Sequence, residues 1–315
     1  MNQVTDNPFP RSEDHKRYYT YNYYLKQTYG YKLAKIPLNA GFTCPNRDGT
    51  KSTGGCLFCS ARGSGDSIEA FASTLADQYD TGLARARKKW PDVPGIAYFQ
   101  SYSNTYAPLP VLQKIFTPFL EREDVAAVAI ATRPDCLEPE TIAWLAGQDK
   151  EVWIELGLQS IHEKTMSALN RQHSTQEVAE KVALLKAAGI PVCLHIINGL
   201  PGESKEDMLA TARWVADIHP DALKIHMLHV VANAPLARIY EKNPFPLLSQ
   251  EEYVDIVCNQ LALLPDDIII ERVTGDGLKD DLVAPLWTLR KTAVINDIDK
   301  ALVARNSWQG KNYSK

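Results

Sequence analysis

The sequence predicts an α/β fold, a partial (β/α)6 barrel similar to a TIM barrel, with extensions at both ends. Apolar strand segments alternate with amphipathic helical segments six times and one extra strand follows, which indicates parallel strands joined by right-handed crossovers. Two central strands carry polar residues on one face, whereas strands of a doubly wound sheet are usually apolar on both. A doubly wound sheet is the alternative architecture.

Three regions are expected: a basic, tyrosine-rich N-terminal extension (1–33), the barrel (34–232), and a C-terminal extension (233–315) with an extra strand, helices and a basic tail. Apolar stretches bounded by turn-forming residues predict the strands. The expected strands are 34–40, 95–102, 125–132, 152–159, 192–197, 223–230 and 268–273.

Helices are predicted between these strands from apolar periodicity and end signals. Pro139 suits the first turn of a helix over 138–147. Ser174 and Glu177 form a capping box for a helix that Gly189 stops, and the next helix begins at Ser204. The other expected helices are 67–89, 109–121, 235–241 and 249–263.

The polar faces of two strands predict a barrel interior that holds a ligand. In 152–159, Glu155, Gly157 and Gln159 share one face with Trp153, and the other face is apolar. In 192–197, Cys193 and His195 share a face in the same way. Chemistry in such a barrel lies at the carboxyl ends of the strands, where the segments rich in glycine, proline and polar residues fall.

The 315 residues are 45% hydrophobic and 23% charged, which is typical of a globular protein with a sizeable core. The chain has no apolar signal-peptide core and no run of about 18 apolar residues, so we expect no membrane span and a cytoplasmic location. Six cysteines in a chain of this length do not form a disulfide framework, which agrees with a reducing compartment.

The formal net charge of −4 hides two basic ends. Residues 1–43 carry six Lys/Arg against three Asp/Glu, and residues 286–315 carry six against two. Seven of the fourteen tyrosines lie within 18–31, a composition suited to stacking on nucleobases while lysines and arginines neutralise phosphates. The competing interpretation is a helix whose tyrosine face closes the bottom of the barrel or packs on its flank.

Three cysteines, Cys44, Cys56 and Cys59, lie within sixteen residues after the first expected strand, and the next cysteine is Cys136. Three thiolates can hold three irons of a [4Fe–4S] cube and leave the fourth iron open. The alternatives are a zinc site, which usually takes four ligands, and a redox pair of Cys56 and Cys59.

The other candidates each have a structural alternative. Glu155 and Gln159 suit the hydroxyls of a ribose, with Gly157 leaving room, or Glu155 is a buried carboxylate paired with Arg133 or Arg171. His195 is a proton donor or a hydrogen-bonded core histidine.

The turn over 198–203 lets a flat adenine lie against bare backbone at Gly199 and Gly202, or it is only a tight connector. His226 and His229 end the strand 223–230, and their spacing predicts opposite faces and no shared metal. Asp276 is a substrate contact or part of a simple turn.

Together these motifs resemble the radical S-adenosylmethionine (radical SAM) superfamily. The long spacing Cys44-x11-Cys56-x2-Cys59 is similar to the branch typified by the catalytic subunit of Elongator. Nearly the whole chain is similar to small stand-alone bacterial proteins called YhcC-like. The other motifs that carry the resemblance are Glu155-Leu-Gly-Leu-Gln159-Ser160, Arg171-x-His173 and His195-Ile-Ile-Asn-Gly-Leu-Pro-Gly-Glu203.

The resemblance implies an enzyme in which the three cysteines ligate a [4Fe–4S] cluster. The cluster would reductively cleave S-adenosylmethionine to a 5′-deoxyadenosyl radical, which abstracts hydrogen from the substrate. Arg133 or Arg171 would pair with the methionine carboxylate. The cofactor contacts expected from the resemblance are Ser101, Ser103, Asn104, Arg133, Glu155, Gln159, Arg171, His195, Gly199 and Gly202.

The implied partners are an electron donor of the flavodoxin or ferredoxin type and RNA, with a tRNA wobble uridine as the expected target. The alternatives are a small metabolite or peptide as substrate, or a metal-stabilised RNA-binding barrel without catalysis. The segment 101–104 replaces the Gly-Gly-Glu common in the superfamily, and no second cysteine cluster or acetyltransferase domain follows.

Overall fold

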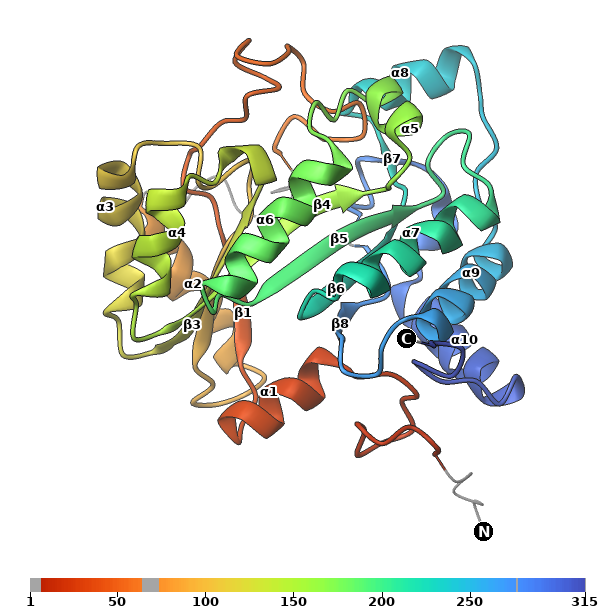
Figure 1. The fold of residues 1–315 in the computed structure, drawn as a ribbon, viewed down its shortest axis with the longest axis horizontal. Helices are drawn as coiled ribbons and strands as arrows, with labels where there is room; N and C mark the ends of the chain where they lie inside the picture. The colour runs from red at the N-terminus through yellow and green to blue at the C-terminus, as the bar shows by residue number, and fades with distance from the viewer. Residues whose placement is uncertain (1–6, 64–73, 276, 315) are drawn as a thin grey trace.

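The structure is a computed structural model that describes residues 7–63, 74–275 and 277–314. A seven-stranded parallel sheet forms its centre and curls into a half-barrel (Figure 1). The strand order is β1-β2-β3-β4-β5-β6-β8, so β1 and β8 are the two edges and the expected partial barrel is confirmed. The strands are β1 (Ala34–Leu38), β2 (Gly95–Phe99), β3 (Val125–Thr132), β4 (Glu151–Gln159), β5 (Val192–Asn198), β6 (Ala222–Met227) and β8 (Ile269–Arg272).

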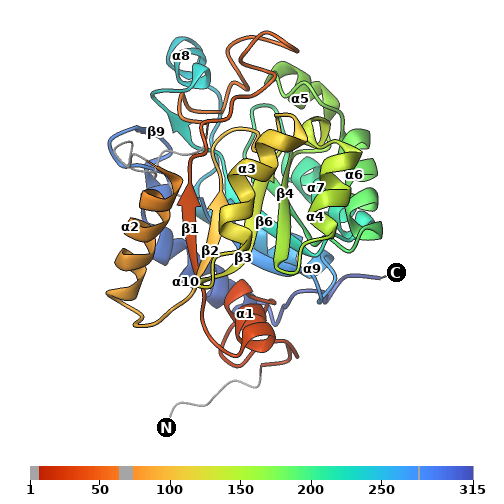
Figure 2. The same cartoon turned by 90° about the vertical axis from the view of Figure 1, so that its left-hand side faces the viewer.

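Helices cover the outer face of the sheet (Figure 2). Four of them begin with a capping box, including the expected pairs at Ser174 and Ser204, and these caps satisfy backbone N–H groups that the first turn leaves unpaired. These outer helices are α2 (Leu75–Arg87), α3 (Leu109–Leu120), α4 (Pro139–Ala146), α6 (Thr175–Ala187), α7 (Lys205–Ile218) and α9 (Gln250–Leu263). The first part of the expected helix 67–89 lies outside the described residues.

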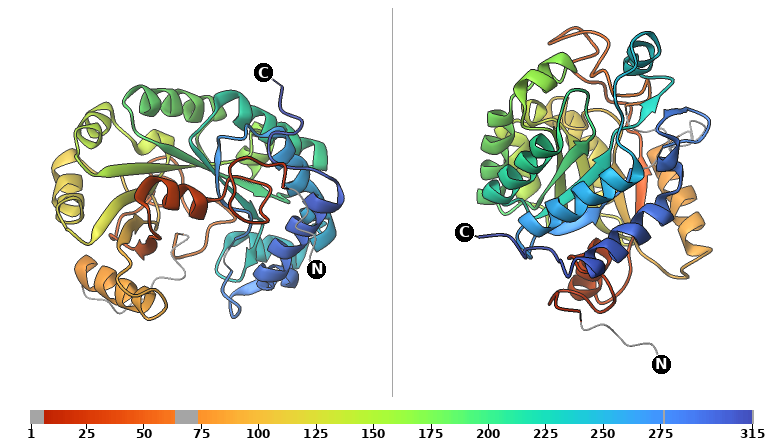
Figure 3. Two further views of the ribbon diagram at one scale, coloured as in Figure 1. Left: turned by 90° about the horizontal axis from the view of Figure 1, so that it is seen from below. Right: turned by 90° about the vertical axis from the view of Figure 1, so that its right-hand side faces the viewer.

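Helix α1 (Tyr21–Tyr29) lies across the base of the barrel (Figure 3). The hydroxyls of Tyr24 and Tyr29 donate to the Glu151 carboxylate at 3.0 and 2.5 Å, and the Tyr24 ring meets the edge of Trp153. The tyrosine face therefore closes the bottom of the barrel, as the competing interpretation of this segment expected.

The C-terminal region differs from its prediction in one respect that matters for the site. The expected strand 223–230 is not continuous, because β6 ends at Met227 and β7 (Val230–Val231) pairs with β9 (Leu282–Ala284) in a separate antiparallel ribbon. The other elements are α5 (Glu163–Ala168), α8 (Pro235–Lys242), α10 (Lys291–Ala304) and the short 3-10 helices η1 (Pro134–Cys136) and η2 (Leu286–Leu289).

Segments near the two ends of the chain meet at the base. Gln309 accepts from the Tyr19 backbone N–H at 2.8 Å and donates to the carbonyls of Pro265 and Ile268. Its own backbone N–H donates to the carbonyl of Arg17. Within the described residues, no helix is both long and apolar enough to cross a membrane.

Candidate active site at the mouth of the barrel

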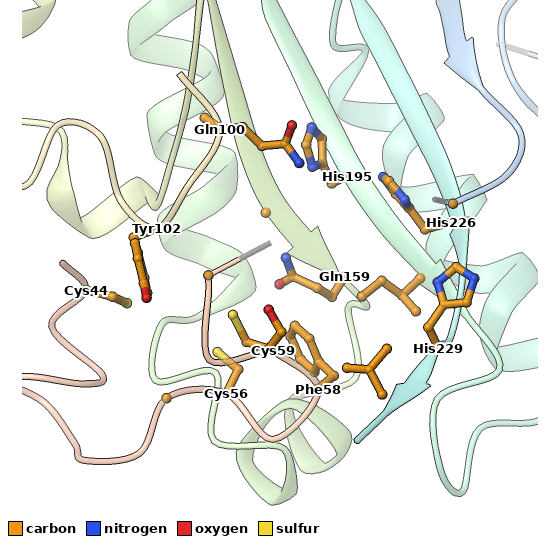
Figure 4. Close-up of a pocket in the computed structure, with 18 of the residues that line it drawn as sticks. Cys44, Cys56, Phe58, Cys59, Gln100, Tyr102, Gln159, His195, His226 and His229 are labelled. Carbon is orange, nitrogen blue, oxygen red and sulfur yellow. The ribbon is translucent and has the colours of Figure 1, made fainter. Parts of the chain in front are cut away.

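A cavity of about 380 Å³ lies at the carboxyl ends of the strands. One wall comes from the cysteine loop, the floor from inward-facing residues of β4 to β6, and the far wall from the segments that follow β6 and β8 (Figure 4). The sequence predicted this position from the turn segments that follow the strands.

All three cysteines of the loop line this cavity, and none is in a disulfide. The buried Asn46 holds the loop in place, since its side-chain amide donates to the carbonyls of Asn170 at 2.7 Å and Arg171 at 2.9 Å. In Figure 4, Cys56 and Cys59 point the same way into the cavity, and Cys44 lies apart from them.

The three cysteines suit a cluster in which each thiolate ligates a separate iron. Burial and the neighbouring Cys59 raise the pKa of Cys56 to about 12, so thiolates here require nearby positive charge such as iron supplies. In the described ranges, no three His, Cys, Asp or Glu side chains converge as ligands of one ion must. A zinc ion needs ligands that converge on one point, whereas a cube takes each cysteine at a separate iron.

Gln159, at the end of β4, presents an acceptor to the cavity. Its Oε1 is buried and, within the described part of the chain, has no hydrogen-bond partner. Such an atom suits a ligand hydroxyl, as expected for a ribose contact. Gly157 was expected to leave room for the ribose. It leaves room for the Gln159 amide, which folds back into the space that a side chain at 157 would fill.

Both arginines that were expected to pair with the methionine carboxylate already have hydrogen-bond partners within the protein. Arg171 is 1% exposed and donates to the carbonyls of Leu158, Ser160 and His173, which fixes the end of β4. Arg133 forms a two-bond pair with Asp135 at 2.9 and 2.8 Å. Both line the cavity, but neither is held ready as a free clamp for a carboxylate.

The alternative interpretation of Glu155 was correct about its burial but wrong about its partners, Arg133 or Arg171. Its carboxylate is fully buried and pairs with Lys35 of β1 at 2.5 Å and with Lys224 of β6, and it accepts from Tyr98 at 2.7 Å. Burial opposes its ionisation, yet Lys224 and Lys35 hold the pKa of Glu155 well below its ordinary value. Because these protein groups occupy both carboxylate oxygens, Glu155 organises the barrel interior.

Lys35 also reaches Glu271 of β8 at 2.8 Å. This ion pair joins the first and last strands of the sheet across the interior.

His195 is brought into the cavity as predicted, and its Nε2 lies 2.8 Å from Oε2 of Glu155. The prediction that His226 and His229 lie on opposite faces was wrong, because both line the cavity. Their spacing does not follow strand alternation, since β6 ends at Met227, between them.

Several expected contacts lie elsewhere. Ser103 lines the cavity, but Ser101 and Asn104 do not, and the Asn104 amide instead donates to backbone carbonyls of β2 and β3. Gly199 and Gly202 are likewise not among the lining residues. Asp276 lies outside the described residues.

Sequence reasoning missed Lys35 and Lys224, and it gave His226 no role in the site. The signal was present in β6, where Lys224 and His226 alternate with apolar Leu223, Ile225 and Met227 as Cys193 and His195 do in β5.

Comparison with known proteins decides the family. A model of the radical SAM superfamily matches residues 44–215, and a model of the radical SAM C-terminal domain matches residues 220–304. The chain belongs to the radical SAM superfamily. It is therefore an enzyme of a family that uses a [4Fe–4S] cluster and S-adenosylmethionine, and the three cavity cysteines are the residues that suit the cluster.

Two relatives match this radical SAM chain over most of their length. YtqA of Bacillus subtilis is 44% identical over 99% of this chain and 98% of its own, and YhcC of Escherichia coli K12 is 32% identical over 88% and 90%. A tRNA uridine(34) acetyltransferase of Methanocaldococcus infernus is 29% identical over 48% of this chain and 28% of its own. The solved structure of Elp3 from the same archaeon has a TM-score of 0.67 at 17% identity, covering 88% of this chain and 64% of that one, which shows the shared fold.

Acid should destabilise this radical SAM fold through its buried imidazoles. Burial and the positive charges of Arg133 and Arg171 lower the pKa of His173 to about 3, whereas an unfolded histidine titrates near 6.5. Below about pH 6.5 the unfolded chain therefore binds more protons than the folded chain. The free energy of unfolding is highest above this pH and decreases as the pH falls. Between pH 8 and 5.5, His173 should account for a loss of about 1.4 kcal/mol.

Urea unfolding at the two pH values measures this loss. His173→Gln should lower stability at pH 8 but reduce the difference between the two pH values by about that amount. An unchanged difference in the variant would show that His173 is protonated equally in both states.

Proposed function

We propose that this radical SAM enzyme modifies tRNA, with a wobble uridine as its target. When bound, the cluster and S-adenosylmethionine supply reductive cleavage to a 5′-deoxyadenosyl radical that takes hydrogen from the substrate. The chain itself supplies the cysteine loop, the Gln159 acceptor and a closed floor on one cavity. The observation that favours tRNA is the similarity to the archaeal tRNA uridine(34) acetyltransferase across half of this chain.

The charged N-terminal region offers less RNA-binding surface than its composition suggested. Lys16 pairs with Asp299, Arg17 is 5% exposed and Lys35 lies in the barrel interior. These three side chains stabilise the fold. An RNA contact must therefore come from other basic residues.

An exposed basic and aromatic surface remains beside β1, and we call it the tryptophan patch. It consists of Tyr31, Lys32, Lys89 and Trp90. The Trp90 ring is 37% exposed, and the ammonium groups of Lys32 and Lys89 lie 4.7 and 4.8 Å from its centroid. A ring flanked by two cations suits a stacked nucleobase beside its phosphates, so the patch supports an RNA partner.

Trp90→Ala is expected to weaken binding of unmodified tRNA about tenfold, because stacking on an aromatic ring contributes on the order of 1–3 kcal/mol per base. Fluorescence anisotropy at fixed salt measures the dissociation constant. Leu184→Ala is the matched control, since it removes another exposed apolar side chain, 51% exposed on α6. Equal binding by both variants would exclude the tryptophan patch as an RNA contact.

The function is tested with tRNA from a strain that lacks this protein. Nucleoside mass spectrometry should show a missing modification, and that tRNA should stimulate 5′-deoxyadenosine formation by the anaerobically reconstituted enzyme with a flavodoxin or ferredoxin as reductant. An unchanged nucleoside profile with no stimulation would contradict the tRNA proposal. Stimulation by a peptide or metabolite fraction would instead support the alternative substrates.

A further inference from the structure

Opposite the cysteine loop, the cavity is lined by three imidazoles that we call the histidine wall. It consists of His195 on β5, His226 on β6 and His229 just after β6 (Figure 4). The rings of His195 and His226 lie 5.5 Å apart between centroids and are tilted by 43°. A ligand at the cysteines and a ligand at the histidine wall would thus share one cavity and face each other.

His226 carries an unexplained polar atom. Its Nε2 is buried, and among the described residues it has no hydrogen-bond partner. A buried polar atom left without a partner destabilises the folded state, and native proteins retain few of them. The position of His226 on the cavity wall indicates that a bound molecule supplies the missing partner.

Two of the three rings in the histidine wall, those of His195 and His229, are held in place. The Glu155 carboxylate fixes His195 through Nε2. The bare backbone of Gly275 and Gly277 packs on the ring of His229, and a side chain at position 275 would come within 2.6 Å of its Cε1. A preformed wall of flat rings suits a planar ligand, because little side-chain entropy is lost when the ligand binds.

The rings of His195 and His226 supply no positive charge for a phosphate. Burial and the positive charge of Lys224 lower the pKa of His195, and burial and Arg272 hold the pKa of His226 well below its ordinary value. Both rings are therefore neutral near pH 7. Lys224 itself is 1% exposed and pairs with Glu155 and Glu271, which offset its charge.

We propose that His226 is the residue that recognises the substrate base, through a hydrogen bond between its Nε2 and the edge of an uncharged pyrimidine. Uracil presents adjacent carbonyl and imide N–H groups, so either tautomer of a neutral imidazole finds its partner on that edge. The base lies against the histidine wall and faces the cofactor held at the cysteines. This inference rests on the proposed function and extends it to a named recognition residue.

The direct test is the imidazole nitrogen spectrum of the 15N-histidine-labelled, anaerobic holoenzyme, in which His226→Gln identifies the His226 signals. Uridine added in the presence of S-adenosylmethionine should shift the Nε2 resonance of His226 saturably. A shift produced by S-adenosylmethionine alone would make His226 a cofactor contact and overturn the proposal. The absence of a shift with each of uridine, cytidine, adenosine and guanosine would overturn it as well.

A second measurement uses turnover with tRNA from the deletion strain. His226→Phe keeps a flat ring but removes the polar atom, and it should lower the ratio of modified nucleoside to 5′-deoxyadenosine at least tenfold. His226→Gln should recover part of the ratio, because its amide can bond the same base edge. His219→Phe, at the end of α7, is the matched control and should keep the wild-type ratio.

The two proposals fail in different ways. If the deletion strain lacks a tRNA modification but no nucleoside shifts the His226 resonance, only the recognition role fails. If that tRNA is unchanged and does not stimulate the enzyme, the tRNA function fails whatever His226 binds.

Discussion

Replacing Cys56 by alanine is expected to abolish 5′-deoxyadenosine formation, with a loss of at least 100-fold against the reconstituted wild type. Cys56 lines the cavity, and the side-chain amide of Asn46 lies 3.5 Å from its sulfur. Two remaining cysteines cannot hold the cube on three irons. Iron and sulfide content, absorbance near 400 nm and the yield of 5′-deoxyadenosine should therefore all fall together.

Cys258→Ala is the matched control for this experiment. Cys258 is buried in α9, where its thiol faces the carbonyl of Ile298 in α10, so the same atoms are removed far from the cavity. This variant should lose some stability but keep its cluster. A Cys56→Ala protein that retained four irons and full cleavage would refute the assignment of the loop.

Glu155→Gln is expected to destabilise the fold by about 3–5 kcal/mol, the largest stability effect among these variants. The substitution keeps the shape of the side chain but leaves the ammonium groups of Lys35 and Lys224 in the interior with Glu271 alone. An uncompensated buried charge costs far more than a lost surface pair. Urea unfolding followed by circular dichroism measures the loss.

Two further variants test the cause of this effect. Glu155→Gln combined with Lys224→Met should recover part of the stability, because it removes the surplus charge together with its lost partner. Glu206→Gln breaks the exposed pair with Arg213 and should cost at most about 1 kcal/mol. If Glu155→Gln lowered the free energy of unfolding as little as Glu206→Gln, the interior ion pairs would contribute little to stability.

The barrel could be predicted because each strand carries its own signal. The alternation in β4 and β5 assigns one face of each strand to the interior, and the capping pairs at Ser174 and Ser204 mark where helices begin. Helix α10 was not given bounds, although Val294, Ile298 and Leu302 repeat every four residues on its buried face.

The gathering of Cys44, Cys56 and Cys59 at one cavity could be predicted because they are close in sequence. The partners of Glu155 could not, since Lys35 is 120 positions away and any of several basic residues could have reached the interior. His226 and His229 were misjudged for a local reason, as strand alternation applies only while the strand continues. Contacts between distant segments depend on register and curvature, which a single sequence does not specify.

The ion pair between Lys35 and Glu271 has a mechanical consequence. In a closed barrel, backbone hydrogen bonds between the first and last strands fix the circumference. Here β1 and β8 are sheet edges, and the side chains of Lys35 and Glu271 span the distance between them. The separation of the two edge strands in this half-barrel therefore depends on a side-chain ion pair and not on backbone hydrogen bonds between them.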